Sequence, residues 1–494
     1  MKLHVENKYD CDVLIVGAGP AGAACGYHLA SAGLKVFLLD YQSFPRDKVC
    51  GDFVGPVAIK ELNLMGINAL TDFTKTNTIN QAALFVDGKL CITKDLPVVE
   101  GLPDHGRVIP RMILDNWIVR AAVRAGVILI ENCRCNDFKT FTNGIMAICK
   151  IGKQQTTYYA KLLVGADGSS STISRIVTGE KPKSEDRIVA VRAYYENIHC
   201  ISNQAELYFT SKSFPGYYWL FPTGSTTANI GVGMVLENFP KEETNLKDLL
   251  LELIEKDTSL GTKIGNGRLA DKVVGWPLST YNPDMKNVAE RVVLIGDAAG
   301  LINSLNGEGI QYAMLSGRWA SETITSCLKQ EKFDVTSLSA YSKKIKSEVG
   351  YDMALANTVI QFIRNRTLNQ VWLKLLAVIV DRAKYDKTYA DIAGGILAGL
   401  VPANKAITFS FLSKTALQAL HTTTFETIKS FTKGPAHLTR LFFDASRAGL
   451  HISSDMLTNY KDYIKWGKGI FTTSAHLSGH VIKDMHKKIV GQQD

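Results

Sequence analysis

The chain has 494 residues, which is too many for one hydrophobic core and predicts two or three domains. Hydrophobic residues make up 46% of it and the mean hydropathy is +0.01, which excludes a mostly disordered protein. The formal net charge is +9, but the basic residues are neither dense nor part of a reading module, so we expect no nucleic-acid partner. The first predicted strand covers residues 12–16, which leaves no room for a signal peptide.

The cysteine pattern and the hydropathy predict a cytoplasmic protein with reduced thiols. The nine cysteines are odd in number and lack the spacing of a disulfide framework. No segment contains the ~18 uninterrupted apolar residues of a membrane-spanning helix. Cys133 and Cys135 lack further ligands and are expected to pack in a strand. His476, His480 and His486 have no carboxylate or thiol partner at ligand spacing in the sequence, so no metal site is predicted.

The segment 11–40, CDVLIVGAGPAGAACGYHLASAGLKVFLLD, predicts a dinucleotide-binding unit. Two apolar runs are typical of parallel strands, and a helix lies between them. The glycines supply a tight turn, a close approach for a diphosphate and a helix–strand contact, while the helix start attracts an anion. An acid 23 residues after the first glycine can bind a ribose hydroxyl, which favours FAD or NAD over NADP. The residues predicted to hold the nucleotide are Gly17, Gly19, Pro20, Ala21, Gly22 and Asp40.

Two further glycine motifs follow apolar strands much later in the chain. VGADG ends at Gly168, and VLIGDAAG ends at Gly300. The first resembles the Asp-Gly motif of single-component flavin monooxygenases and their relatives, and the second resembles their Gly-Asp motif. That resemblance implies that Asp297 binds the ribityl chain of non-covalent FAD, and that a helix beginning near Gly307 points its positive end at the flavin ring. Arg111, in RMILD before a helix, matches the arginine segment that such proteins place beside FAD.

The string PGYYWLFP, residues 215–222, resembles the pattern of the geranylgeranyl reductase family of flavoproteins. That pattern is a proline followed by Tyr-x-Trp-x-Phe-Pro. DKVCGD matches the family's cysteine-bearing loop, and NSLNGEGI resembles its segment after the Gly-Asp motif. The chain departs from the family in the spacing of Pro215, in Ser304 where proline is usual, and in Arg175, which falls one residue late. The resemblance spans residues 10–412, and the further cofactor-binding residues that it implies are Lys48, Cys50, Gly51, Arg111, Asp167, Gly168, Gly296, Asp297, Gly307, Glu308, Gly309 and Ile310.

Alternating aromatic residues mark the expected substrate side of the flavin. Tyr217, Trp219 and Phe221 share one strand face at period two, so their rings can wall an apolar cavity. An ordinary hydrophobic core would also use such a stripe. Beside the flavin motifs, we favour the cavity and predict that Tyr217 and Trp219 act in catalysis.

Cys50 is the third predicted catalytic residue. Arg46 and Lys48 lie close to it in the sequence, and cationic neighbours of this kind lower the pKa of a thiol. The family resemblance places Cys50 near the reactive edge of the flavin, where it can orient an alkene, donate a proton or exclude water. Tyr217 and Cys50 are the candidates for a proton relay. Glu308 either tunes the flavin or caps the start of a helix.

The predicted fold is α/β (α+β overall), with a Rossmann-like FAD-binding domain, an inserted antiparallel-sheet substrate domain and a helical C-terminal region. The flavin motifs are separated by other material, so the FAD-binding domain is discontinuous. It is predicted to comprise residues 9–83, 109–185 and 287–345, with residues 84–108 and 186–286 forming the substrate domain, 346–413 the helical region and 414–494 a basic helical extension.

The extension from residue 414 carries eleven Lys and Arg against six Asp and Glu. One interpretation is a helix docked on the body with solvated lysines, and the other is peripheral contact with anionic lipid at the inner membrane face. Met456, Tyr460, Tyr463, Ile464 and Phe471 share a predicted apolar helix face, and Lys461, Lys465 and Lys468 form an adjacent basic stripe.

Three functions fit these signals. The first is an FAD-dependent reductase of carbon–carbon double bonds in a prenyl or related apolar lipid. The second is a flavin monooxygenase or halogenase of a natural-product scaffold, because the same fold supports oxygen chemistry. The third is a flavoprotein that binds without turnover. The chain has no second strand–GxGxxG–helix unit, so NAD(P)H binding transiently or a ferredoxin-like protein is the expected electron donor.

Overall fold

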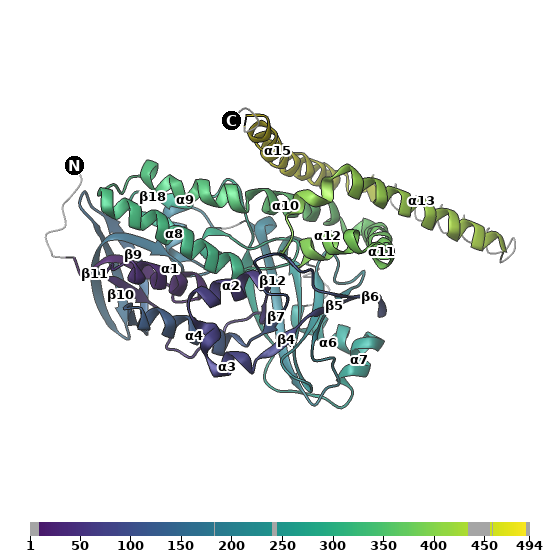
Figure 1. The fold of residues 1–494 in the computed structure, drawn as a ribbon, viewed down its shortest axis with the longest axis horizontal. Helices are drawn as coiled ribbons and strands as arrows, with labels where there is room; N and C mark the ends of the chain where they lie inside the picture. Colours follow the sequence, from purple (N-terminus) through teal and green to yellow (C-terminus); the bar gives the residue numbers. More distant parts are fainter. Residues whose placement is uncertain (1–8, 182, 240–244, 433–454, 457, 491–494) are drawn as a thin grey trace.

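The computed structural model describes residues 9–181, 183–239, 245–432, 455–456 and 458–490. Two large sheets lie side by side, and helices cover them (Figure 1). The predicted class, with a Rossmann-like unit beside a second sheet and a helical C-terminal region, is confirmed. Within the described ranges, no helix is both long enough and apolar enough to cross a bilayer.

The first sheet has the order β18-β19-β11-β1-β2-β8, with β10 paired to β11 and β9 paired to β10. The strand β1 at its centre pairs in parallel with both neighbours, and α1 packs against it. A parallel strand buried on both faces requires a continuous apolar run, which CDVLIV supplies. The strands are β1 Cys11–Val16, β2 Val36–Leu39, β8 Ile128–Ile130, β9 Cys133–Thr140, β10 Ile145–Ile151, β11 Gln154–Gly165, β18 Val288–Ala289 and β19 Val292–Leu294.

Helix α1 (Pro20–Ser31) packs against α8 (Ile310–Gln330) and α4 (Arg111–Arg124). The contact with α8 is close because Gly317 has no side chain: a Cβ there would lie 2.5 Å from the carbonyl oxygen of Ala21. This packing brings the start of α8 next to the start of α1, although the two are far apart in sequence. The other helices of this part are α2 Pro56–Leu64, α3 Thr71–Thr74, α5 Thr172–Thr178 and α9 Val335–Glu348.

The second sheet has the order β16-β12-β15-β14-β13-β5-β6, with β17 also paired to β12. Its strands are antiparallel except for β13 and β5. We expected residues 84–108 to belong wholly to this sheet, but β7 instead pairs with β3 and β4 in a separate small sheet. The elements are β3 Phe53–Val54, β4 Asn77–Ile79, β5 Gln81–Val86, β6 Lys89–Asp95, β7 Gly106–Val108, β12 Arg187–Glu196, β13 Gln204–Phe209, β14 Tyr217–Pro222, β15 Thr227–Val235, β16 Arg268–Leu269, β17 Val274–Ser279, α6 Leu246–Lys256 and α7 Thr258–Ile264.

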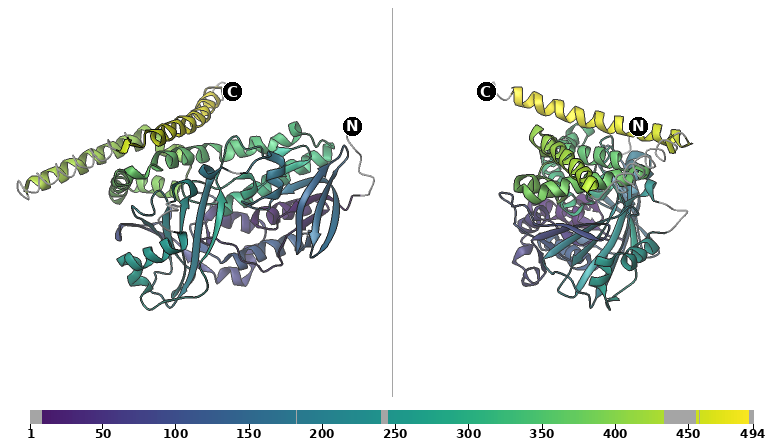
Figure 2. Two further views of the ribbon diagram at one scale, coloured as in Figure 1. Left: turned by 180° about the vertical axis from the view of Figure 1, so that it is seen from behind. Right: turned by 90° about the vertical axis from the view of Figure 1, so that its right-hand side faces the viewer.

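The C-terminal helices form an outer layer. Helix α11 contacts β6 at the edge of the second sheet, and α15 packs on α10. Figure 2 shows α13 and α15 on the outside of this layer. These helices are α10 Gly350–Ile363, α11 Asn369–Tyr385, α12 Lys387–Leu397, α13 Phe409–Thr432 and α15 Tyr460–Val490.

The turn after β1 yields a stability prediction. Gly17 has φ +101°, and a Cβ there would lie 2.3 Å from the carbonyl oxygen of Ala166, at the end of β11. Gly17→Ala should therefore cost the ~1–3 kcal/mol of a strained backbone and, in addition, the cost of this clash. Gly33 is the matched control, because it has φ +84° but no atom within 4 Å of its Cβ position. Urea unfolding followed by circular dichroism should show a clearly larger loss for Gly17→Ala, and equal losses would contradict the close approach.

Candidate active site

The turn between β1 and α1 is shaped to hold an anion against the backbone. A Cβ at Gly22 would lie 1.9 Å from the carbonyl oxygen of Gly17, so neither position tolerates a side chain. Gly19 caps α1 without a side-chain hydrogen bond, and Pro20 is the first helical residue. The first-turn N–H groups and the helix dipole therefore face outward from a glycine surface, as a diphosphate requires.

Asp40 directly follows β2 and fixes this turn. Its carboxylate accepts hydrogen bonds from the backbone N–H groups of Ala18 (2.9 Å) and Gln42 (3.0 Å), and it is 3% exposed. Arg46 pairs with Asp40 (3.3 Å) and with Asp115 of α4 (3.2 Å). The guanidinium lies 3.7 Å from the Cβ position of Gly19, which puts a cation beside the diphosphate turn.

Arg46 was missed as a cofactor-binding candidate. Its position in the sequence predicted only a cationic neighbour of Cys50. The available signal was its place six residues after Asp40, on the loop that leaves the nucleotide-binding strand.

Segments far apart in the sequence meet beside this turn. Lys48 pairs with Asp297 at 3.0 Å, which joins the cysteine-bearing loop to the segment after β19. Gly296 has φ +56°, and a Cβ there would lie 2.7 Å from the Cβ of Ala21. A Cβ at Gly309 would lie 3.8 Å from Oδ1 of Asp297. The structure therefore brings together the predicted residues of the glycine turn, the cysteine loop and the Gly-Asp motif.

Glu308 lies at the start of α8. The helix begins at Ile310 rather than near Gly307, which has φ +70° and forms part of the preceding turn. The carboxylate of Glu308 accepts a hydrogen bond from the backbone N–H of Gln311 at 3.2 Å, so it caps the helix. Burial raises its pKa to about 7, although the hydrogen bonds from the helix N–H groups oppose this shift.

Asp167 of the Asp-Gly motif acts within its own segment. Its Oδ2 accepts hydrogen bonds from the backbone N–H groups of Thr172 (2.6 Å) and Ile173 (3.2 Å), which cap α5. Gly168 follows with φ +78°. Arg175 contacts Thr172 of the same helix, so the structure gives it a local partner rather than one in the glycine turn.

Arg111 opens α4 and forms a two-point ion pair with Asp115, at 2.6 and 2.9 Å. Both side chains are buried, and the pair lies one i to i+4 turn apart on the helix. Arg111 also faces Cys50. Arg111 therefore lies against the cysteine-bearing loop, and its predicted place beside FAD stays a prediction.

The aromatic stripe lies on β14, opposite the cysteine loop. The ring centroids of Tyr217 and Trp219 are 6.2 Å apart, and those of Trp219 and Phe221 are 6.0 Å apart. A Cβ at Gly51 would lie 3.0 Å from the Phe221 ring and 3.3 Å from Nε1 of Trp219. Gly231 on β15 makes room for the indole, because a Cβ there would lie 2.3 Å from it. We call these three aromatic residues of β14 the aromatic wall.

The expected activation of Cys50 is wrong. Burial raises the pKa of its thiol, and Arg111 lowers it by less. The two cations adjacent in sequence are engaged elsewhere: Arg46 with Asp40, and Lys48 with Asp297. Cys50 is therefore a thiol rather than a thiolate near neutral pH.

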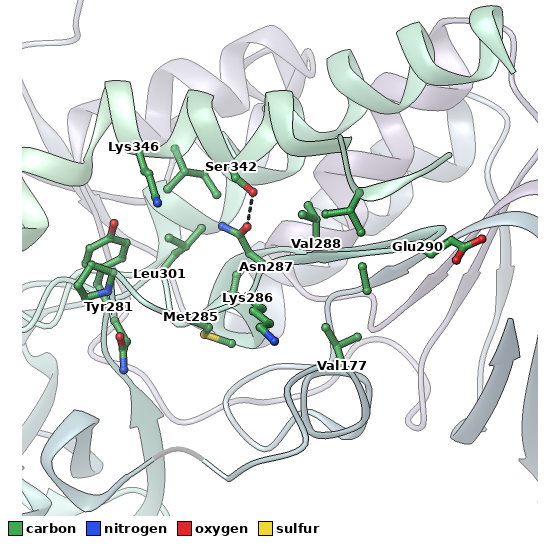
Figure 3. Close-up of a pocket in the computed structure, with 16 residues that line it drawn as sticks. Val177, Tyr281, Met285, Lys286, Asn287, Val288, Glu290, Leu301, Ser342 and Lys346 are labelled. Carbon is green, nitrogen blue, oxygen red and sulfur yellow. Dashed lines mark hydrogen bonds between the residues drawn. The ribbon is translucent and has the colours of Figure 1, made fainter. Parts of the chain in front are cut away.

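A pocket near the first sheet is separate from this site. This cavity of about 490 Å³ lies between β18, α9 and the segment around Met285, with Lys286 and Lys346 among its lining residues (Figure 3). None of the predicted site residues lines it. Among the described residues, no group of His, Cys, Asp or Glu side chains is arranged to hold a metal ion.

A protein-family model described as an FAD binding domain matches residues 10–344. The chain belongs to this family. It is 31% identical to a menaquinone reductase of Mycolicibacterium smegmatis over 326 residues, which is 64% of this chain and 76% of that protein. It is 28% identical to a digeranylgeranylglycerophospholipid reductase of Methanococcus vannielii over 377 residues, which is 74% of this chain and 90% of that protein. The predicted geranylgeranyl reductase-type relationship is thereby confirmed, and the protein is an FAD-dependent oxidoreductase.

Solved structures share the fold. A geranylgeranyl bacteriochlorophyll reductase-like protein from Thermoplasma acidophilum superposes with a TM-score of 0.62 at 22% identity, covering 82% of this chain and 95% of that one. The flavin-dependent halogenase CmlS superposes with a TM-score of 0.63 at 18% identity, covering 76% and 73%. The fold is therefore common to reductases and halogenases, and it does not by itself select the reaction.

The carboxylate of Asp40 provides a test of cofactor binding. Asp40→Ala leaves backbone donors of the turn unpaired and removes the predicted ribose acceptor, so FAD affinity should fall by about 1–3 kcal/mol, or roughly fivefold to 150-fold. Asp12→Ala is the control, because Asp12 lies on the same sheet but pairs with Lys161 at the other end of β1. Each variant is dialysed and then denatured, and the fluorescence of the released flavin measures how much FAD the protein had retained. We expect denaturation to release the flavin completely, because it is bound non-covalently. Equal retention by the two variants would contradict the assignment.

Proposed function

We propose that this oxidoreductase reduces carbon–carbon double bonds of a prenyl-type or related apolar lipid. The observation that carries the proposal is the aromatic wall pressed against the cysteine loop, beside the converging nucleotide-binding segments. The printed names of two similar proteins support it, since one acts on a menaquinone and the other on a digeranylgeranylglycerophospholipid.

The residues of the turn fit FAD. The glycine surface, Arg46 and the start of α1 would hold the diphosphate, Asp40 the ribose, and the Lys48–Asp297 pair the ribityl side. Reduced FAD supplies a hydride when bound. We infer that NAD(P)H, binding transiently, or a ferredoxin-like protein reduces it.

The chain's own residues supply the rest of the chemistry. An isolated alkene has no carbonyl to polarise it, so the developing positive charge must be stabilised by electron-rich rings such as Trp219. The wall also excludes water from an apolar substrate. Tyr217 and Cys50 hold protons for the second alkene carbon: burial raises the pKa of both groups, so both keep their proton at neutral pH.

Anaerobic turnover tests this proposal against oxygen chemistry. Reduced protein under nitrogen is mixed with prenyl alcohols, prenyl diphosphates and lipid quinones, and products are analysed by mass spectrometry for added pairs of hydrogens. Alkene-dependent reoxidation of the flavin supports a reductase. A peroxyflavin signal in oxygen, with no anaerobic product, would instead support the monooxygenase or halogenase alternative.

The aromatic wall yields a second prediction. Trp219→Phe keeps a ring but loses the indole and its hydrogen bond to Asn229 (3.0 Å), so alkene turnover should fall at least about tenfold while stability falls by only ~1 kcal/mol. Tyr218→Phe is the matched control, because Tyr218 is the next residue on β14 but faces the core of the second sheet. The control should lose a similar stability and keep its turnover. Equal turnover in the two variants would show that the wall is ordinary core.

We further propose peripheral membrane contact through α15. One side of this helix docks on α10: Nε1 of Trp466 donates to the carbonyl oxygen of Gln361 at 2.9 Å. The outward side exposes Tyr460, Ile464 and Phe471, which are 54%, 52% and 77% exposed. Large apolar side chains exposed beside lysines suit an anionic lipid surface, of the kind expected at the inner membrane face for a cytoplasmic protein.

Two residues of the predicted stripes have other roles. Tyr463 faces inward, where its hydroxyl donates to Asp455 at 2.9 Å, so it is not part of the exposed apolar face. Lys465 pairs with Glu237 of the body. Lys461 and Lys468 remain on the exposed side of α15. The docked and lipid-facing interpretations therefore describe opposite sides of one helix.

Vesicle binding tests the lipid-facing side. Ile464→Ser with Phe471→Ser should weaken sedimentation with anionic vesicles at least about tenfold, because each buried apolar side chain contributes ~1.5–3 kcal/mol. Leu64→Ser with Val98→Ser is a control matched in exposure, at 52% and 79%. Lys461→Gln with Lys468→Gln should reduce the salt dependence of binding. Equal sedimentation of all variants would remove the membrane proposal.

A further inference from the structure

A buried acid lies directly behind the cysteine loop. Asp52 has no solvent exposure and φ +64°, a backbone conformation that is uncommon for a residue with a side chain. Its Oδ2 accepts hydrogen bonds from the hydroxyl of Tyr194 (2.5 Å) and from Nδ2 of Asn229 (2.8 Å). Its Oδ1 accepts from the backbone N–H of Arg111 at 3.3 Å. Three donors converge on this carboxylate, which is the arrangement that suits its ionised form.

One amide side chain connects this acid to the aromatic wall. Asn229, fully buried on β15, donates through Nδ2 both to Asp52 and to the backbone carbonyl of Cys50, each at 2.8 Å. Its Oδ1 accepts from Nε1 of Trp219 at 3.0 Å. The backbone N–H of Asp52 contacts the sulfur of Cys50 at 3.4 Å. The acid, the loop and the wall therefore form one hydrogen-bonded cluster.

Charged groups surround this cluster from several elements. Arg111 of α4 faces both Cys50 and Asp52, and Arg192 of β12 stacks on Tyr194 with 4.4 Å from its guanidinium carbon to the ring centroid. Tyr217 of β14 also lies near Cys50. Burial raises the pKa of Asp52 to about 6, while its two side-chain donors and the two arginines lower it. Asp52 is therefore ionised at neutral pH, and it opposes the attraction of Arg111 for a thiolate.

We infer that Asp52 is a positioning residue that fastens the Cys50 loop to the aromatic wall, and that its negative charge adds to burial in disfavouring the thiolate of Cys50. An anion beside a thiol disfavours the thiolate, and Arg111 alone would favour it. The inference rests on the proposed function only in giving the thiol proton a use, since a thiol can donate a proton to an alkene carbon and a thiolate cannot. The protonation state itself is independent of any substrate.

The test measures the thiolate fraction of Cys50 in the full-length, FAD-containing protein. Iodoacetamide is applied from pH 6 to pH 10.5, and the Cys50 peptide is quantified by mass spectrometry, which separates it from the other cysteines. In the wild type the midpoint of the alkylation profile should lie above 9.0, the ordinary value for this group. Asp52→Asn should move the midpoint down by about one pH unit, which is about tenfold faster alkylation below the midpoint.

Asp47→Asn is the matched control. Asp47 is an acid of the same loop, three residues before Cys50, but its side chain is 40% exposed and pairs with Arg192. Its removal should leave the midpoint close to that of the wild type. If Asp52→Asn does not fold, Asp52→Ser removes the same charge with a smaller side chain that still carries a hydroxyl.

The possible outcomes distinguish an effect of the Asp52 charge on the Cys50 thiol from an increase in the mobility of the loop. A wild-type midpoint at or below that of a free thiol, or an unchanged midpoint in the Asp52 variants, would overturn the inference. So would a higher plateau rate without a midpoint shift, because a merely loosened loop changes access and not the thiolate fraction. A shifted midpoint in a protein that reduces no alkene would leave the inference standing and remove the proposed function instead.

Discussion

The pairing of charges on the loop 46–52 is the constraint on which the rest of the site depends. Arg46 pairs with acids at the end of β2 and in α4, Asp47 with β12, Lys48 with the segment after β19, and Asp52 with β12 and β15. Charges buried as deeply as those of Arg46, Lys48 and Asp52 are costly unless they find partners, so the loop is held in a conformation that pairs them. That conformation fixes the second sheet against the nucleotide-binding sheet, because the partners come from both.

The same pairing explains the chemistry available at the site. With Arg46 and Lys48 committed to distant acids, the cation that faces Cys50 is Arg111, which pairs with Asp115 and whose attraction for a thiolate is outweighed by burial. Cys50 therefore keeps its proton beside an aromatic wall. A protonated thiol, electron-rich rings and a water-excluding surface suit proton donation to an apolar alkene better than nucleophilic attack.

The C-terminal helix α15 is held by packing against α10 and not by the charge pairs of the loop. Helix α15 docks through Trp466 and through Gly469, where a Cβ would lie 2.1 Å from Nε2 of Gln361, so the helices approach closely on that side. Only one side of α15 is buried by this docking. The opposite side exposes large apolar residues beside lysines. The lipid-facing proposal depends on this division of one helix into two surfaces.

The sequence by itself determined the nucleotide-binding half of the protein, because its signals are local. The apolar run before Gly17, the glycines of the turn and the carboxylate of Asp40 are all recognisable within one short segment. The aromatic residues of β14 alternate along the strand, so their rings share one face whatever surrounds it. Only the tertiary structure decided which hydrogen-bond and ion-pair partners the polar residues of the site have. Contacts between segments far apart in the chain decide three features of the site. These are the positive φ of Asp52, the hydrogen bond from Asn229 to Asp52, and the pairing of Arg46 with Asp115 instead of Cys50. Electrostatic environment is set by burial and by such distant neighbours, so the direction of the Cys50 pKa shift could not be obtained from the residues adjacent to it in sequence.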